Sequence, residues 1–219
     1  MLAASGTGPR FRVRGMPGQK FIAIAGNIGS GKSELTGFLC RKYGLDACLE
    51  PNEENPYLAD FYRDMKTWAY RSQMFFLVRK FRLHLQLQRE GRAVVLDRTL
   101  HEDAEIFARN LHLQRFIDKR DFSTYWELYR TMSATLRPPD LMIQLRCPVA
   151  TLRQRIRKRG RAMEQDIPVN YLRRLNRLYD DWFERYDLSP VLVLETDKLD
   201  WMTDLVDRAD LFRAVERHL

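Results

Sequence analysis

Short runs rich in apolar residues recur along the chain and are separated by longer stretches with helical periodicity. Strands that are apolar at nearly every position, with helices between them, are typical of a parallel sheet covered on both faces. The pattern therefore predicts an α/β fold with a five-stranded parallel sheet flanked by helices. The expected strands are 21–25, 46–50, 92–97, 141–145 and 191–195.

Helices are expected between these strands, and the chain length suits one domain. The 219 residues are enough for a single α/β domain with a substantial core. We expect this domain over 20–219, after a flexible basic tail at 1–19 that lacks acidic residues. A transit peptide is the alternative for the tail. The expected helices start at Glu34 behind the first strand and follow at 57–88 with a bend near Trp68, 101–118, 121–136, 148–159, 168–186 and after Asp204.

Composition excludes some classes of protein. No apolar run approaches the roughly 18 residues that cross a bilayer, so we expect no membrane partner. The three cysteines are scattered and odd in number, which is typical of reduced thiols in a cytoplasmic protein. The net charge of +8 fits either nucleic acid or small polyphosphates. Because no aromatic residue interrupts the densest basic cluster, at 153–161, we favour polyphosphate over nucleic acid.

A glycine-rich motif follows the first strand and precedes a helix. Its three glycines allow backbone N–H groups to turn inward around a polyphosphate. Lys32 is then expected to reach the β- and γ-phosphates, and the Ser33 hydroxyl to bind Mg²⁺. The alternative is a turn that merely joins strand to helix. The predicted ATP-binding loop is Gly26, Asn27, Ile28, Gly29, Ser30, Gly31, Lys32 and Ser33.

Polar residues stand where the second and third strands end, at the edge where such sheets bind ligands. Glu50 ends the second strand, and Asp97-Arg98-Thr99 end the third. A carboxylate after an apolar strand resembles the Walker B element that helps to hold Mg²⁺. Alternatively, Glu50 is a solvated loop acid and Asp97 is a helix N-cap. Their joint position beside the phosphate loop favours function for both.

An arginine cluster follows the fourth strand. Arg155 and Arg159 share a helix face, Gly160 ends the helix, and Arg161 follows. This arrangement predicts a helical lid at about 155–166 that closes over phosphates. The alternative is a solvated helix face.

Several ordered motifs resemble deoxynucleoside kinases over about 20–193. Leu49-Glu50-Pro51 is followed by Asn55-Pro56-Tyr57-Leu58, Phe61-Tyr62, Trp68, Gln73 and Phe76-Leu77. Asp97-Arg98-Thr99 precedes Glu102-Asp103 and Ile106-Phe107-Ala108, and the arginine lid completes the match. The resemblance is closest to the bacterial deoxyadenosine and deoxyguanosine kinases.

The resemblance implies catalytic roles for three residues. Glu50 accepts the proton of the nucleoside 5′-hydroxyl, and Arg98 stabilises the transferring phosphoryl group. The family assigns the acid of the Asp97 motif either to Mg²⁺ or to proton acceptance, so the base stays open between Glu50 and Asp97.

It also implies a nucleoside pocket. Tyr62 and Glu164 hold the sugar 3′-hydroxyl, while Glu50 and Arg98 border the 5′ position. Gln73 and Asp103 read the edge of the base, Phe107 stacks on it, and Trp68 lines the same pocket. Lys80 stands at a position where relatives often place an arginine that reads the base.

The implied function is ATP- and Mg²⁺-dependent phosphorylation of a deoxynucleoside, with purines favoured. A homodimer formed by the stretches 68–88 and 101–118 is implied as well. One alternative is a thymidylate-type monophosphate kinase, against which Glu50 argues because it would repel a phosphorylated acceptor. The other is a non-catalytic P-loop nucleotide-binding protein.

Overall fold

The chain forms one five-stranded, wholly parallel sheet. The structure is a computed structural model that describes residues 20–48, 55–161, 164–199, 201 and 204–218. The strand order is β2-β3-β1-β4-β5, which confirms the predicted sheet. The expected tail at 1–19 and the end of the second expected strand lie outside the described residues. The strands are β1 Phe21–Gly26, β2 Asp46–Cys48, β3 Val94–Asp97, β4 Leu141–Arg146 and β5 Val191–Glu195.

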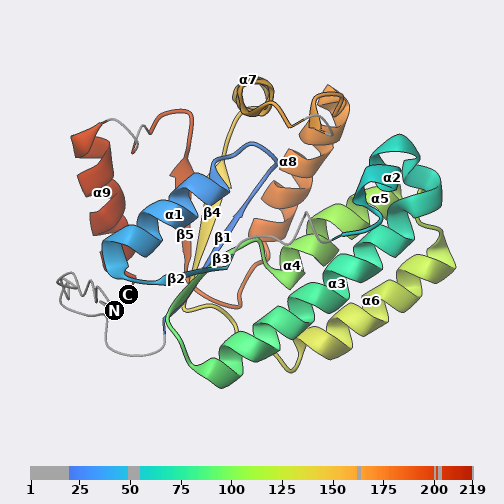
Figure 1. The fold of residues 1–219 in the computed structure, drawn as a ribbon, viewed down its shortest axis with the longest axis horizontal. Helices are drawn as coiled ribbons and strands as arrows, with labels where there is room; N and C mark the ends of the chain where they lie inside the picture. Colours follow the sequence, from blue (N-terminus) through green and yellow to red (C-terminus); the bar gives the residue numbers. More distant parts are fainter. Residues whose placement is uncertain (1–19, 49–54, 162–163, 200, 202–203, 219) are drawn as a thin grey trace, which may run out of the picture.

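Helices cover both faces of the sheet (Figure 1). Ile22, Ile24 and Ile143 pack on one face against α1 and α9, and Ala23, Ala25 and Met142 pack on the other against η2 and α8. This division follows from the period of two along a strand. The helices are α1 Lys32–Tyr43, α2 Leu58–Arg63, α3 Met65–Glu90, α4 Leu100–Glu102, η2 Asp103–Ala108, α5 Arg109–Leu113, α6 Lys119–Ser133, α7 Val149–Arg159, α8 Val169–Phe183 and α9 Leu205–Glu216.

Two helix predictions were wrong in detail, and aspartate caps explain both. The expected bend near Trp68 is a break at Asp64, whose side chain accepts the Thr67 N–H at 3.2 Å and starts α3. The expected helix 101–118 ends at Leu113, because Asp118 caps the next helix by accepting two backbone N–H groups. Its middle, η2, is also π-helical, a rare geometry that is frequent at functional sites.

The buried His84 predicts a loss of stability in acid. Burial lowers its pKa from 6.5 to about 3, so the unfolded state takes up a proton first as the pH falls below 6.5. The free energy of unfolding should therefore fall between pH 6.5 and 3, by up to about 1.4 kcal/mol per pH unit. In urea titrations, His84→Leu should show a shallower decline from pH 7 to pH 5 than the wild type.

The exposed His218 supplies the matched control, since His218→Leu removes an imidazole without changing the core. Burial also lowers the pKa of His101, to about 4. The free energy of unfolding of His84→Leu should therefore still fall somewhat as the pH decreases. Equal slopes in wild type and His84→Leu would contradict the assignment.

Candidate active site

The loop after β1 wraps closely under α7. Gly29 has φ +82°, and a Cβ at this position would lie 2.9 Å from Ile156 Cγ1 and 3.0 Å from the Leu152 carbonyl oxygen of α7. Gly31, at φ +100°, provides the turn into α1. Only glycine adopts these conformations readily, so the glycines of the motif are explained by backbone shape. Asn27 anchors the loop to α8 by donating to Leu172 O at 3.0 Å and to Asn176 Oδ1 at 2.6 Å.

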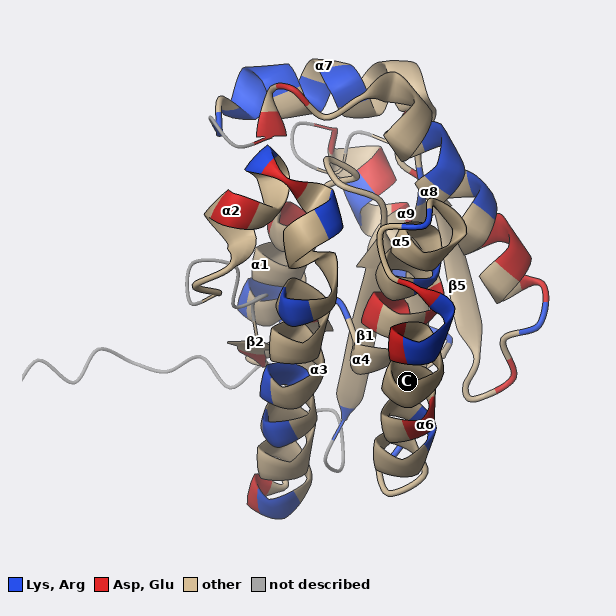
Figure 2. Cartoon of the chain, turned by 90° about the vertical axis from the view of Figure 1, so that its right-hand side faces the viewer, with Lys and Arg blue, Asp and Glu red and all other residues tan. Residues whose placement is uncertain are grey.

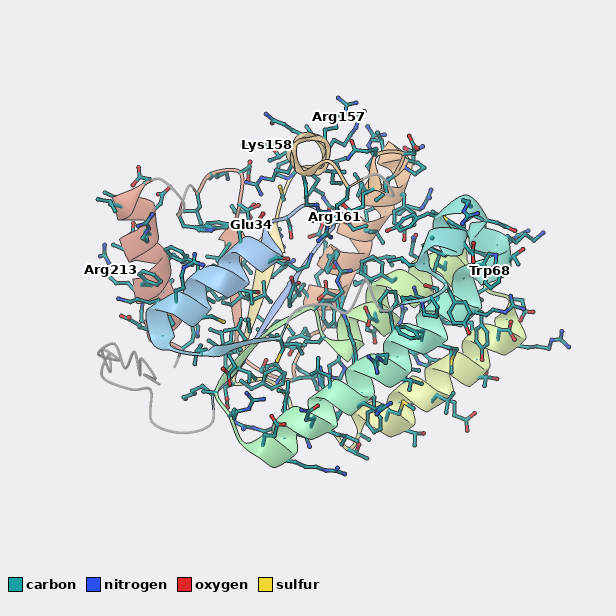
Figure 3. All side chains as sticks on the ribbon, viewed as in Figure 1. Glu34, Trp68, Arg157, Lys158, Arg161 and Arg213 are labelled. Atoms are coloured by element: carbon teal, nitrogen blue, oxygen red, sulfur yellow. The ribbon has the colours of Figure 1, made fainter. Side chains whose placement is uncertain are left out.

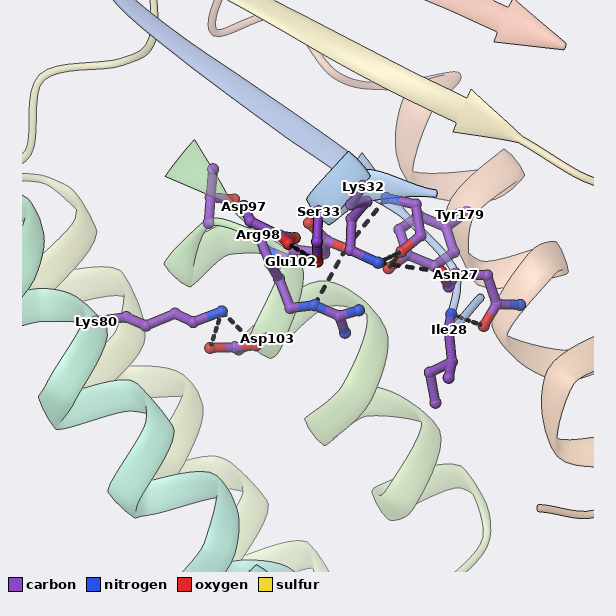
Figure 4. Close-up of polar contacts among 12 residues, drawn as sticks. Asn27, Ile28, Lys32, Ser33, Lys80, Asp97, Arg98, Glu102, Asp103 and Tyr179 are labelled. Atoms are coloured by element: carbon purple, nitrogen blue, oxygen red, sulfur yellow. Dashed lines mark hydrogen bonds and ion pairs between the residues drawn. The ribbon is translucent and has the colours of Figure 1, made fainter. Parts of the chain in front are cut away.

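Lys32 and Ser33 begin α1 and reach in two directions (Figure 4). Lys32 Nζ donates to the carbonyls of Gly26 at 2.8 Å and Asn27 at 3.1 Å. The Ser33 hydroxyl donates to Asp97 Oδ2 at 2.7 Å, which joins the loop to the end of β3. Asp97 is not the N-cap of the next helix, because Thr99 has that role and accepts the Glu102 N–H at 3.3 Å.

Arg98, the residue directly after β3, has an unusual backbone conformation. Its φ is +70°, which is uncommon for a non-glycine residue and is frequent where a side chain is held for function. Its guanidinium lies 4.2 Å from the centre of the Phe107 ring, and its side chain is buried. The structure thus places Phe107 under Arg98.

A wholly buried acid, Glu102, lies beside Arg98. Its Oε1 accepts the Gly26 N–H at 3.2 Å and the Tyr179 hydroxyl, and Arg98 Nε lies 3.7 Å away. Burial raises the pKa of Glu102, while the charges of Arg98 and Lys32 oppose that shift.

The expected base-reading residues lie farther along the same side, where α3 packs on η2. Lys80 Nζ and Asp103 form a buried ion pair, with Nζ 3.3 Å from Oδ1 and 3.2 Å from Oδ2. Gln73 is also buried, and its Oε1 has no hydrogen-bond partner among the described residues. Tyr62 on α2 is half-buried, and Trp68 on α3 stacks on Tyr57 with ring centres 5.9 Å apart.

The arginine cluster lies on and after α7, a helix rich in basic residues that carries no acidic residue (Figure 2). Arg157 points away from the molecule, whereas Arg161 lies on the inner side of α7 (Figure 3). Arg159 and Arg161 both pair with Glu164, the latter at 3.4 Å. The helix ends at Gly160 as predicted, and residues 162–163 of the expected lid lie outside the described residues.

Arg155 braces the loop from the other side of α7. Its guanidinium donates to the Ser30 carbonyl at 3.2 Å, to Thr196 Oγ1 at 3.1 Å and to Thr196 O at 2.6 Å. A cavity of about 710 Å³ opens beside it, between the phosphate loop, α7 and the segment after β5. Its lining includes Gly31, Lys32, Lys158, Arg159, Thr196, Asp197 and Trp201.

Sequence reasoning placed many of these residues together but left some out. Glu50 lies outside the described residues, so its position cannot be compared with Asp97 and Arg98. Tyr179 and the segment 196–201 were missed. Tyr179 stands on the apolar face of α8 and looks like an ordinary core residue. Thr196 and Asp197 follow β5, and this position directly after a strand could have identified them as site residues from the sequence.

The parallel sheet, the phosphate loop after β1 and Asp97 on the adjacent strand together define a P-loop nucleotide-binding enzyme. Residues 22–219 match the sequence model of the deoxynucleoside kinase family. The chain therefore belongs to the deoxynucleoside kinase family and is a phosphoryl transferase, as its motifs predicted.

Individual relatives agree. A deoxyguanosine kinase of Lactobacillus acidophilus is 36% identical over 197 residues, which cover 85% of each chain. A deoxyadenosine/deoxycytidine kinase of Bacillus subtilis is 32% identical over 191 residues, covering 86% of this chain and 88% of the relative. The structure of deoxyadenosine kinase from M. mycoides with dCMP and dCDP has a TM-score of 0.79 at 30% identity and covers 91% of this chain and 100% of that one.

Proposed function

We propose that this kinase transfers the γ-phosphoryl group of ATP, with Mg²⁺, to the 5′-hydroxyl of a purine deoxynucleoside. The observation that carries the proposal is the Ser33–Asp97 hydrogen bond, which joins the phosphate loop to the acid of the next strand. Relatives that are named deoxyadenosine and deoxyguanosine kinases support the purine preference. We also propose a cytoplasmic location, since the three cysteines are free and suit a reducing compartment.

The donor would bind with its phosphates on the loop and its base in the cavity beside Thr196 and Trp201. The amides of the loop and Lys32 would neutralise the β- and γ-phosphates. A related deoxyadenosine kinase from M. mycoides has been solved with dATP, which supports an adenine nucleotide as a ligand of this fold.

The residues beside the loop suit Mg²⁺, a hard cation that prefers oxygen ligands. Asp97 Oδ1 is buried without a hydrogen-bond partner among the described residues, while Oδ2 faces the Ser33 hydroxyl. Asp97 and Ser33 would hold the ion, which would supply positive charge to offset that of the phosphates.

The acceptor would lie on the opposite side of Arg98, between α2, α3 and η2. Gln73 presents an amide with both donor and acceptor groups to a base edge. Asp103, held by Lys80, offers acceptor oxygens, and Phe107 offers a ring for stacking. Tyr62 and Glu164 would hold the 3′-hydroxyl, with Trp68 lining the pocket and Glu50 or Asp97 taking the 5′ proton.

A panel of nucleosides with radiolabelled ATP and Mg²⁺ tests the proposal. Deoxyadenosine or deoxyguanosine should accept phosphate fastest, and product should form at the 5′ position. A panel in which only nucleoside monophosphates accept phosphate, or in which ATP is hydrolysed without transfer, would overturn it.

The lid arginines should act on charge that develops during transfer. Arg159→Ala should lower kcat by about 10²-fold, more than it weakens deoxynucleoside binding, because Arg159 lines the cavity beside the phosphate loop. The exposed Arg157, on the outer side of α7, gives the control Arg157→Ala. An unchanged kcat for Arg159→Ala would contradict the lid assignment.

A homodimer through the helical segments 68–88 and 101–118 is part of the proposal. Apolar side chains that the core does not use support it: Val78 is 40% exposed and Leu113 is 65% exposed. A symmetric helix interface would bury them. Sedimentation at several concentrations should give a dimer, and a concentration-independent monomer would exclude it.

Among the described residues, no helix has both the length and the apolar character needed to cross a membrane.

A further inference from the structure

Glu102 has no role in the proposed reaction, although it is 0% exposed at the centre of the site. It ends α4, immediately before the π-helical η2. A carboxylate in such a place is costly to bury unless charged or hydrogen-bonding groups surround it. Its surroundings therefore indicate what it does.

Three neighbours of Glu102 lie around the same oxygen. Oε1 accepts the Gly26 N–H at 3.2 Å and the Tyr179 hydroxyl, with Arg98 Nε at 3.7 Å. The oxygen accepts two hydrogen bonds, and the charge of Arg98 lies beside it as an ion pair. The acid thus links three elements: the phosphate loop, α8 and the residue after β3.

The hydrogen bonds reach both backbone polar groups of Gly26, the first residue of the phosphate loop. Glu102 accepts the N–H of Gly26, while the Gly26 carbonyl accepts from Lys32 Nζ and from the Tyr179 hydroxyl, each at 2.8 Å. The single hydroxyl proton of Tyr179 is thus within hydrogen-bond distance of both Glu102 Oε1 and the Gly26 carbonyl. Each of the two peptide units that flank Gly26 is therefore held, the first through its N–H and the second through its carbonyl.

The same acid also contacts Arg98. The guanidinium of Arg98 lies 4.2 Å from the centre of the Phe107 ring, and Glu102 supplies the opposite charge 3.7 Å from Nε. The backbone of Arg98, at φ +70°, accepts strain to keep the side chain in this place.

We propose that Glu102 is a positioning residue whose carboxylate ties the phosphate loop at Gly26 to Arg98. The tie keeps the phosphate-binding amides and the guanidinium at a fixed separation while the phosphoryl group moves, as preorganised electrostatic catalysis requires. This inference rests on the proposed phosphoryl transfer. Buried ion pairs contribute little to stability compared with apolar packing, so a positional role explains the acid better than a stabilising one.

Glu102→Gln tests the role of the charge with little change in volume. Its carbonyl still accepts from Gly26 and Tyr179, but it no longer attracts Arg98. We expect kcat to fall about 30-fold and the deoxynucleoside KM to change less than about 3-fold. Asp140→Asn is the matched control, because Asp140 also accepts a β1 backbone N–H, from Phe21 at 2.7 Å, at the opposite end of the strand. This control should keep the wild-type kcat.

A double-mutant cycle separates positioning from mere structure. If Glu102 acts through Arg98, adding Glu102→Gln to Arg98→Ala should cause no further loss of the residual rate. Where Glu102→Gln does not give a folded protein by circular dichroism, Tyr179→Phe takes its place, since it removes the hydroxyl donor from Glu102. The loss of kcat that Tyr179→Phe causes should also be absent when it is added to Arg98→Ala.

The outcomes distinguish this inference from the proposed function. A wild-type kcat for Glu102→Gln, or an equal fold-loss with and without Arg98, would overturn the positioning role alone. Wild-type protein that phosphorylates no deoxynucleoside would overturn the proposed function and this inference with it.

Discussion

Lys32→Ala should abolish phosphoryl transfer, with a loss of kcat/KM of at least about 10³-fold. The ammonium of Lys32 is a point charge at the start of α1, held over the loop by the carbonyls of Gly26 and Asn27. From there it would reach the β- and γ-phosphates, whose charge grows most as the bond breaks. Alanine removes that charge and leaves the sheet and its two apolar faces intact. Steady-state transfer of radiolabelled phosphate from ATP measures the effect.

Lys42→Ala is the matched control for this experiment. Lys42 is exposed near the other end of α1, where its ammonium lies 4.7 Å from the centre of the Phe212 ring. Its removal should leave turnover unchanged, while both variants should keep the wild-type circular dichroism spectrum. Wild-type turnover of Lys32→Ala at any ATP concentration would contradict the phosphate-loop assignment.

Glu50→Gln should lower kcat by about 10²-fold or more while deoxynucleoside binding is largely kept. Glutamine has nearly the size and hydrogen-bonding capacity of glutamate, but it cannot take the proton of the 5′-hydroxyl. Asp97→Asn should behave differently, because its loss of activity should be partly restored by higher Mg²⁺ concentration. Initial rates across a series of Mg²⁺ concentrations separate the two roles.

Asp46→Asn serves as the control for Glu50→Gln, because Asp46 is also an acid and lies shortly before Glu50 in the chain. Asp46 begins β2 and pairs with the exposed Arg92 at 2.7 Å, so its change should not alter kcat. A mild effect of Glu50→Gln, together with a loss in Asp97→Asn that Mg²⁺ does not restore, would assign proton acceptance to Asp97.

Local patterns were enough to predict the sheet and its phosphate loop. Apolar runs identified β1, β3, β4 and β5, as expected for parallel strands covered by helices. The second strand was predicted too, although β2 is a short edge strand with exposed residues. The glycine spacing identified the loop from Gly26 to Ser33, because positive φ at Gly29 and Gly31 admits no other residue readily. The helix end at Gly160 followed from the same preference.

Contacts between distant segments decided the rest. The sequence left Asp97 open between a helix cap and a Walker B acid, and the parallel pairing of β1 with β3 placed it beside Ser33. Arg155 was expected to contact phosphates, and the structure shows it bridging Ser30 to Thr196, far along the chain.

The amino-acid sequence by itself determined the fold class, the phosphate loop and the family, since each depends on residues close together along the chain. Tertiary structure alone decided the role of Glu102. It joins Gly26, 76 positions earlier, to Tyr179, 77 positions later. The tertiary structure also brought Lys80 to Asp103. Such contacts depend on how α3, α4 and α8 pack on the sheet, and no local periodicity encodes which polar side chains meet when apolar faces are buried.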